Sequence, residues 1–111
     1  MTRVRLVCRR DGSIRSCVAK GHSGYGSAGS DIVCAAVTVL LRTTAQVLVE
    51  WYGVSVVVDF STRGSFSFCV ADDVGEDSGR LIYAADFLRS GLCSLAKEYP
   101  SCVLVQEQIK D

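Results

Sequence analysis

Apolar and polar residues alternate at the start of the chain, in residues 2–9 (TRVRLVCR). The apolar residues Val4, Leu6 and Cys8 fall on one side of this stretch, and its arginines fall largely on the other. A period of two is typical of a strand with one buried face. Asp11-Gly12 comes next and predicts a tight hairpin turn, in which both residues adopt positive φ. A second strand is expected over 14–20.

Residues 32 to about 50 contain neither Gly nor Pro, and their apolar residues recur every three or four positions. This spacing predicts an amphipathic helix. Ser30 and Asp31 stand immediately before it and are candidate N-cap residues. The expected buried face is wide and consists of Val33, Val37, Leu40, Leu41, Val47 and Leu48.

Two more strands, a second helix and a last strand are predicted in the second half of the chain. Strands are predicted over 54–60 and 65–70, joined by a Ser-Thr-Arg-Gly turn. The acidic segment 72–78 is suited to the start of a second helix, because carboxylates interact favourably with a helix N-terminus. That helix is expected from about 79 to 96, and a last strand over 102–108 follows Tyr99-Pro100. The apolar stripe of this second helix is predicted to consist of Leu81, Ala85, Leu88, Leu92 and Leu95.

The predicted order is strand, strand, helix, strand, strand, helix, strand. We expect an α/β (α+β) fold, with two helices on one face of a mixed, mostly antiparallel five-stranded sheet. A chain of 111 residues fits one domain, 1–111. The other face of the sheet would then be exposed or covered by a second subunit.

Composition narrows the function classes. Twelve basic residues balance twelve acidic ones, which argues against a nucleic-acid or anionic-membrane surface. A hydrophobic content of 49% excludes disorder as the main state. Arginines interrupt the first ten residues, so no secretory signal is expected and the protein is predicted to be cytoplasmic. Of the six cysteines none forms a CxxC pair, and five are expected to be packing residues.

One histidine and one cysteine could carry chemistry. If Asp31 caps the helix, Cys34 lies in its first turn, where the helix terminus and an imidazolium from His22 could both lower the thiol pKa. The N–H groups of residues 33–35 could then hold an oxyanion, and Thr38 lies one turn further along the same face. Asp31 could cap the helix or orient His22. The alternative is a structural histidine and a core cysteine.

The segment around this pair resembles the signature of the ribosomal-processing cysteine protease family. The matching residues are Gly21-His22, Gly29 and Asp31-Ile32-Val33-Cys34-Ala35-Ala36-Val37, with the same interval of twelve positions between histidine and cysteine. The order of elements and the Tyr99-Pro100 junction extend the resemblance over the whole chain.

The resemblance implies a homodimeric cysteine endopeptidase that needs no metal or organic cofactor. His22 would be the general base, Cys34 the nucleophile, and Gly21, Asp31 and Thr38 supporting residues. The implied flap over the cleft contains Ser23, Gly24, Tyr25, Gly26, Gly29 and Ser30. Ser23 stands where the family usually has Ala, and Thr38 replaces a Ser.

The implied substrate is the precursor of a large-subunit ribosomal protein, the twenty-seventh, cut after an aromatic pair in its N-terminal extension. No direct contact with nucleic acid or membrane is expected. Two other functions stay open: a non-catalytic ribosome-associated binding or assembly module, and a redox-sensing thiol protein.

Overall fold

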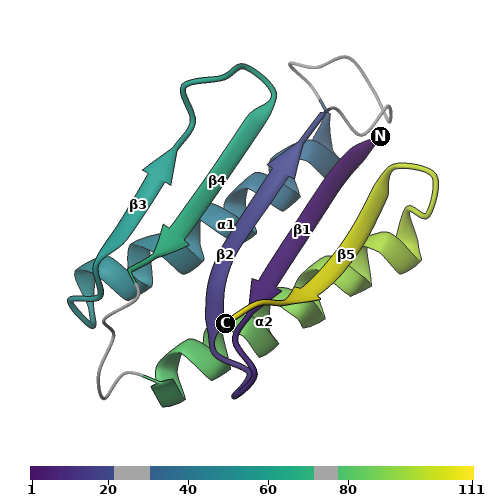
Figure 1. Ribbon diagram of the computed structural model, residues 1–111. Helices are drawn as coiled ribbons and strands as arrows, with labels where there is room; N and C mark the ends of the chain where they lie inside the picture. The colour runs from purple at the N-terminus through teal and green to yellow at the C-terminus, as the bar shows by residue number, and fades with distance from the viewer. Residues whose placement is uncertain (22–30, 72–77) are drawn as a thin grey trace.

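The computed structural model describes residues 1–21, 31–71 and 78–111. Five strands and two helices form two layers in this part of the chain (Figure 1). In chain order they are β1 (Thr2–Cys8), β2 (Ile14–Lys20), α1 (Ile32–Glu50), β3 (Val56–Asp59), β4 (Ser65–Val70), α2 (Ser78–Glu98) and β5 (Val103–Ile109).

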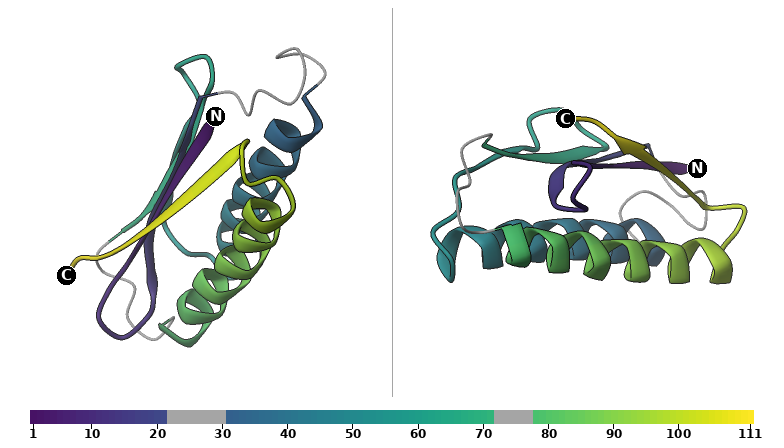
Figure 2. Two further views of the ribbon diagram at one scale, coloured as in Figure 1. Left: turned by 90° about the vertical axis from the view of Figure 1, so that its right-hand side faces the viewer. Right: turned by 60° about the horizontal axis from the view of Figure 1, so that its bottom comes forward.

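The strands form one mixed sheet in the order β3-β4-β2-β1-β5. The only parallel pair among the described strands is β1 with β5, whereas β1–β2, β2–β4 and β3–β4 are antiparallel. Both helices pack on the same face of the sheet, as the edge-on view in Figure 2 shows. The predicted fold class is therefore confirmed.

The turn between β1 and β2 differs from the prediction in one residue. Gly12 has a φ of +92°, but no residue other than glycine has positive φ in the described part of the chain, so Asp11 does not. Instead the Oδ1 atom of Asp11 accepts hydrogen bonds from the N–H and the hydroxyl of Ser13, at 2.9 and 2.6 Å. A short polar side chain that bonds two residues ahead stabilises the turn without a left-handed backbone at the aspartate itself.

The core lies between the sheet and the two helices, and the predicted helix faces are largely correct. The α2 stripe buries Leu81, Ala85, Leu88 and Leu92, and Leu95 packs at its end. On α1 the prediction was wrong at Val47, which is 37% exposed because it lies on the outer side of the helix. The core takes Thr44 and Ala45 instead, and the Thr44 hydroxyl donates to the Leu40 carbonyl at 2.8 Å.

Fewer cysteines are packing residues than expected. All six thiols are free, and three of them are buried: Cys8, Cys17 and Cys102. Cys69 and Cys93 are exposed. The apolar residues beside them in the sequence suggested burial, but Cys69 points to the uncovered face of the sheet, as its pairing with the exposed Val57 shows.

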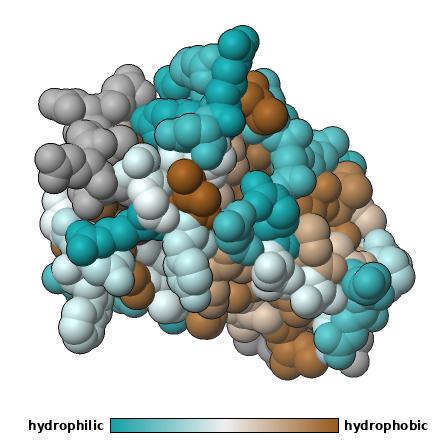
Figure 3. All heavy atoms as spheres, turned by 90° about the horizontal axis from the view of Figure 1, so that it is seen from below, coloured by the Kyte–Doolittle hydropathy of each residue, from teal (hydrophilic) through white to brown (hydrophobic). Residues whose placement is uncertain are grey.

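The helix layer has an apolar outer surface. Exposed apolar and aromatic side chains project from α1 and α2, among them Val39, Val47, Tyr83 and Phe87, and in Figure 3 brown surface lies mostly toward the helices. Helix α1 has 19 residues and a mean hydropathy of 1.9, enough to cross a membrane by length and composition alone. The core helix of a water-soluble protein can pass the same test, and α1 buries Val33, Val37 and Leu41 against the sheet.

Candidate active site

Helix α1 begins at a buried carboxylate. Asp31 has an extended backbone (φ −74°, ψ 105°) and is 4% exposed. Its Oδ1 atom accepts hydrogen bonds from the N–H groups of Val33 and Cys34, at 3.0 and 3.1 Å. These groups would otherwise have no partner inside the helix. Of the two roles that the sequence left open for Asp31, the structure shows the helix cap.

This cap changes the expectation for the oxyanion. The N–H groups of Val33 and Cys34 are bonded to the Asp31 side chain, and the N–H of Ala35 donates to the Asp31 carbonyl at 3.1 Å. All three N–H groups that were expected to stabilise an oxyanion therefore already have an acceptor. In this arrangement they are not available for that role.

The cap also changes the expectation for the thiol. Cys34 is the third residue of α1 and is partly buried. Burial raises the pKa of the Cys34 thiol above its ordinary value, and the negative charge of Asp31 raises it further. The carboxylate opposes the partial positive charge of the helix terminus, which by itself would favour a thiolate. Among the described residues, burial and the Asp31 charge therefore both disfavour the thiolate of Cys34, and activation by His22 stays a prediction.

Cys34 opens into a pocket of about 260 Å³ that both layers line. Gly21, the residue after β2, lines this pocket; it has a φ of +91° and donates its N–H to the Gly64 carbonyl at 2.8 Å. A Cβ atom on Gly21 would come within 2.6 Å of the Met1 carbonyl oxygen. Both constraints require glycine at this position. The residue that precedes His22 is therefore held at the edge of the Cys34 pocket.

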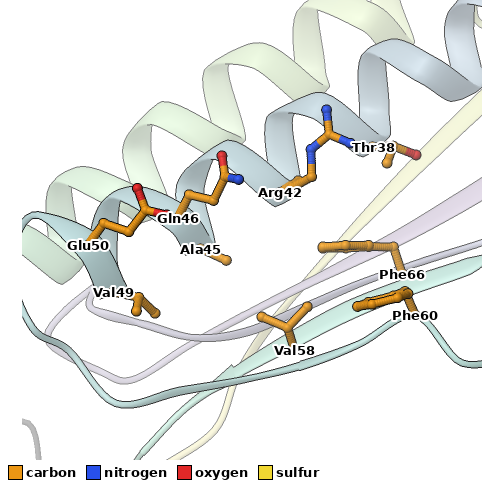
Figure 4. A pocket seen from close by; sticks show the side chains of 9 residues that line it. All are labelled: Thr38, Arg42, Ala45, Gln46, Val49, Glu50, Val58, Phe60 and Phe66. Atoms are coloured by element: carbon orange, nitrogen blue, oxygen red, sulfur yellow. The ribbon is translucent and has the colours of Figure 1, made fainter.

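A larger groove, with a volume of about 570 Å³, adjoins this pocket and is lined by residues of α1 from Thr38 to Glu50. Thr38, Phe60 and Phe66 line both hollows, so the two are adjacent. Figure 4 shows the two phenylalanines opposite Thr38 and Arg42. Their rings stack with centroids 6.5 Å apart and an interplanar angle of 14°. The remaining lining residues are Ala45, Gln46, Val49, Glu50 and Val58.

Three residues of this site were missed by the sequence analysis. Phe60 and Phe66 belong to predicted strands, and nothing in their local pattern indicated that they meet at the thiol pocket. Thr2 lines the pocket beside Cys34, is 2% exposed, and is the one buried side chain in the described part whose polar atom has no hydrogen-bond partner. A polar residue in phase with the buried residues of β1 was the only available signal.

Of the predicted site residues, Gly21, Cys34 and Thr38 line one pocket, and Asp31 caps the helix that carries the thiol. His22 and the predicted flap residues Ser23, Gly24, Tyr25, Gly26, Gly29 and Ser30 lie outside the described residues. Across 1–21, 31–71 and 78–111, no group of three metal-ligating side chains comes together.

A single thiol in the first turn of a helix, in a pocket that opens onto an apolar groove, is an arrangement suited to a thiol-dependent hydrolase that acts on an extended chain. The family comparison agrees. A family model described as cysteine protease Prp matches residues 1–104, and the chain belongs to this family of cysteine proteases. No protein with a curated description matches the chain.

Solved structures share the fold. The chain is similar to an essential ribosomal processing protease Prp from S. aureus, in complex with a covalently linked product peptide: identity is 20%, the TM-score is 0.81, and 96% of this chain and 99% of the other are covered. It is also similar to SMU.848 from Streptococcus mutans, with 22% identity, a TM-score of 0.79, and coverage of 99% and 96%. The S. aureus protease with a substrate peptide has a TM-score of 0.78 at 17% identity over 96% of this chain and 99% of that one.

Proposed function

We propose that the protein is a cytoplasmic endopeptidase that removes the N-terminal extension of a ribosomal protein precursor, the twenty-seventh of the large subunit, with Cys34 as nucleophile and His22 as general base. The observation that supports this most is the position of Cys34, which lies in the first turn of α1 and lines a pocket together with Gly21. Gly21 directly precedes His22 in the sequence, so the proposal pairs Cys34 with the histidine next to a residue that lines the same pocket.

In the proposed reaction His22 takes the proton of the Cys34 thiol, and the sulfur forms a bond to the scissile carbonyl carbon. The C–N bond then breaks as the imidazolium returns its proton to the leaving amine, and water hydrolyses the thioester. Burial and Asp31 both raise the pKa of the thiol. The proposal therefore assigns activation of the thiol to His22.

We assign the residues before the scissile bond to the groove along α1. The stacked Phe60 and Phe66 offer an apolar surface next to the thiol pocket, and aromatic side chains pack on such a pair in offset or edge-to-face geometry. This surface supports the expected cut after two aromatic residues. Phe60→Ala should raise KM for an aromatic peptide about tenfold. Trp51→Ala, which changes an equally exposed aromatic residue away from both hollows, should not.

The decisive experiment is incubation with the ribosomal protein precursor of the same organism, followed by mass spectrometry of the N-terminus of the product. Cys34→Ala and His22→Ala should each abolish cleavage and leave the fold intact. Cys93→Ala is the matched control, because that thiol is exposed on the other helix and lines neither hollow. Turnover by Cys34→Ala at the rate of the control would refute the assignment.

The raised pKa of Cys34 also supports the second candidate, a non-catalytic ribosome-associated module with the same fold. Iodoacetamide labelling at mildly acidic pH separates the two, because only an activated thiol reacts rapidly there. Slow labelling, together with full biological function of Cys34→Ala, would favour the binding module.

The homodimer also remains a prediction. The outer surface of the helix layer, with Val47, Tyr83 and Phe87 exposed, supports it. Light scattering of Phe87→Glu compared with the unchanged protein tests it, because a charge in an apolar interface should produce monomers.

A further inference from the structure

The uncovered face of the sheet is basic although the chain is electrically balanced. Arg3 and Arg5 are exposed on β1 and alternate with the buried Val4 and Leu6, so their side chains leave the sheet opposite the helices. Two further exposed cations lie on this side. We call the set of four the basic sheet face: Arg3, Arg5, Lys20 and Lys110.

The strand register brings two of these cations directly opposite one another. Arg3 on β1 pairs with Lys20 on β2, and both line a hollow of about 330 Å³. Like charges directly opposite across an antiparallel pair destabilise a sheet. Within residues 1–21, 31–71 and 78–111, no carboxylate forms an ion pair with either. An anionic ligand would remove this repulsion.

Neighbouring strands keep acidic side chains off this face. On β5 the outward positions opposite Arg5 and Val7 are Gln106 and Gln108, whereas Glu107 lies on the other side, where it pairs with Arg89. Asp59 is the single carboxylate on the outward positions of the described strands. It lies on the edge strand β3, and its Oδ1 atom accepts hydrogen bonds from the N–H and the hydroxyl of Ser61. Basic and acidic residues are therefore equal in number over the whole chain, but the fold places mainly basic ones on the uncovered face of the sheet.

We propose that the basic sheet face binds the phosphate backbone of double-stranded RNA. Its cations are interleaved with hydroxyl and amide groups such as Ser16 and Gln106, which donate hydrogen bonds to phosphate and ribose oxygens. The outward positions of β1, β2, β4 and β5 carry no aromatic residue on which an unpaired base could stack. RNA rather than another polyanion is chosen because the proposed substrate is a ribosomal protein, and in that respect the inference rests on the proposed function.

The test is binding of a fluorescein-labelled 20-base-pair RNA duplex, measured by anisotropy between 50 and 200 mM KCl. We expect a dissociation constant in the non-specific range, about 10⁻⁴ to 10⁻⁶ M. Arg3→Gln/Arg5→Gln should weaken binding about tenfold at 50 mM KCl and reduce the slope of log K against log[salt] by about 2, since each phosphate contact contributes about 1. The control, Arg63→Gln/Lys97→Gln, removes the same charge elsewhere and should leave the slope unchanged.

Three results would overturn the proposal: no binding of the duplex at 50 mM KCl, equal losses in both double variants, or binding to phosphatidylserine vesicles in place of the duplex. The measurement does not involve the thiol. Cleavage of a free peptide should be equal in Arg3→Gln/Arg5→Gln and in the unchanged protein. Failure of all peptides to be cut would count against the proposed function and leave the RNA result standing.

Discussion

Asp31 combines two roles that a single substitution can separate. Its Oδ1 atom caps α1 by accepting two N–H groups, and its charge raises the pKa of the Cys34 thiol. Asparagine caps helices about as well as aspartate, whereas alanine does not. Asp31→Asn should therefore keep the cap and remove the charge, and Asp31→Ala should remove both.

The expected magnitudes follow from these contacts. Loss of an N-cap costs about 1–2 kcal/mol, and loss of a carboxylate at a helix N-terminus a further 0.3–1 kcal/mol or so. For 111 residues the entropy of unfolding is roughly 230 cal/mol/K, so each kcal/mol corresponds to about 4 °C in Tm. Asp31→Ala should lower Tm by about 9 °C, and Asp31→Asn by about 1–4 °C.

The thiol is followed by iodoacetamide labelling as a function of pH, in a Cys69→Ser/Cys93→Ser background that removes the exposed thiols. Asp31→Asn should move the labelling curve of Cys34 to lower pH, because the charge that opposes the thiolate is gone. Asp59→Asn, a carboxylate in a distant turn, is the control and should not move it. An unmoved or upward-shifted curve in Asp31→Asn, or equal Tm values for the two Asp31 variants, would refute this reasoning.

Three further predictions concern the core and the surroundings of the site. Burial raises the pKa of the Cys17 thiol from 9.0 to about 12. The folded state therefore keeps a proton that the unfolded state loses above pH 9. The free energy of unfolding should fall by about 1.4 kcal/mol per pH unit between pH 9 and pH 12. Urea unfolding at pH 8 and pH 10 should show this loss in the unchanged protein and a clearly smaller loss in Cys17→Ala, where the raised pKa values of the Cys8 and Cys34 thiols still contribute. Gly21→Ala should cost at least about 2 kcal/mol, from a strained φ and a contact with the Met1 carbonyl; Gly79→Ala, where a Cβ meets nothing, should cost no stability in the same thermal melt. Thr2→Val should raise stability by about 1 kcal/mol because it removes a buried hydroxyl without a partner. Thr44→Val, which removes the hydrogen bond to the Leu40 carbonyl, should lower the stability, and calorimetry compares the two variants. If Thr2→Val were less stable than Thr44→Val, the Thr2 hydroxyl would have a partner in solution.

Local pattern was enough to predict most of the fold. The alternating residues of β1 and the helically spaced residues of α2 each place their apolar side chains on one face. Such a pattern predicts both the type of element and the face that packs against the core. The mixed sheet with both helices on one face followed from the order of elements and was confirmed. The helix cap at Asp31 could also be predicted, because capping is a contact between residues two and three positions apart.

What the sequence alone determined, then, is the set of elements, their faces and the place of the thiol at a helix start. Tertiary structure decided the properties that depend on neighbours distant in the chain: the outward direction of Val47 and Cys69, the meeting of Phe60 and Phe66 at the Cys34 pocket, and the pairing of Arg3 with Lys20. It also decided the pKa of Cys34, since desolvation is the larger cause of that shift and burial depends on both layers. Periodicity indicates which side of an element is apolar. It does not indicate which residues meet across the core or which charged residues pair across two strands, because these contacts form only when distant parts of the chain come together in the folded state.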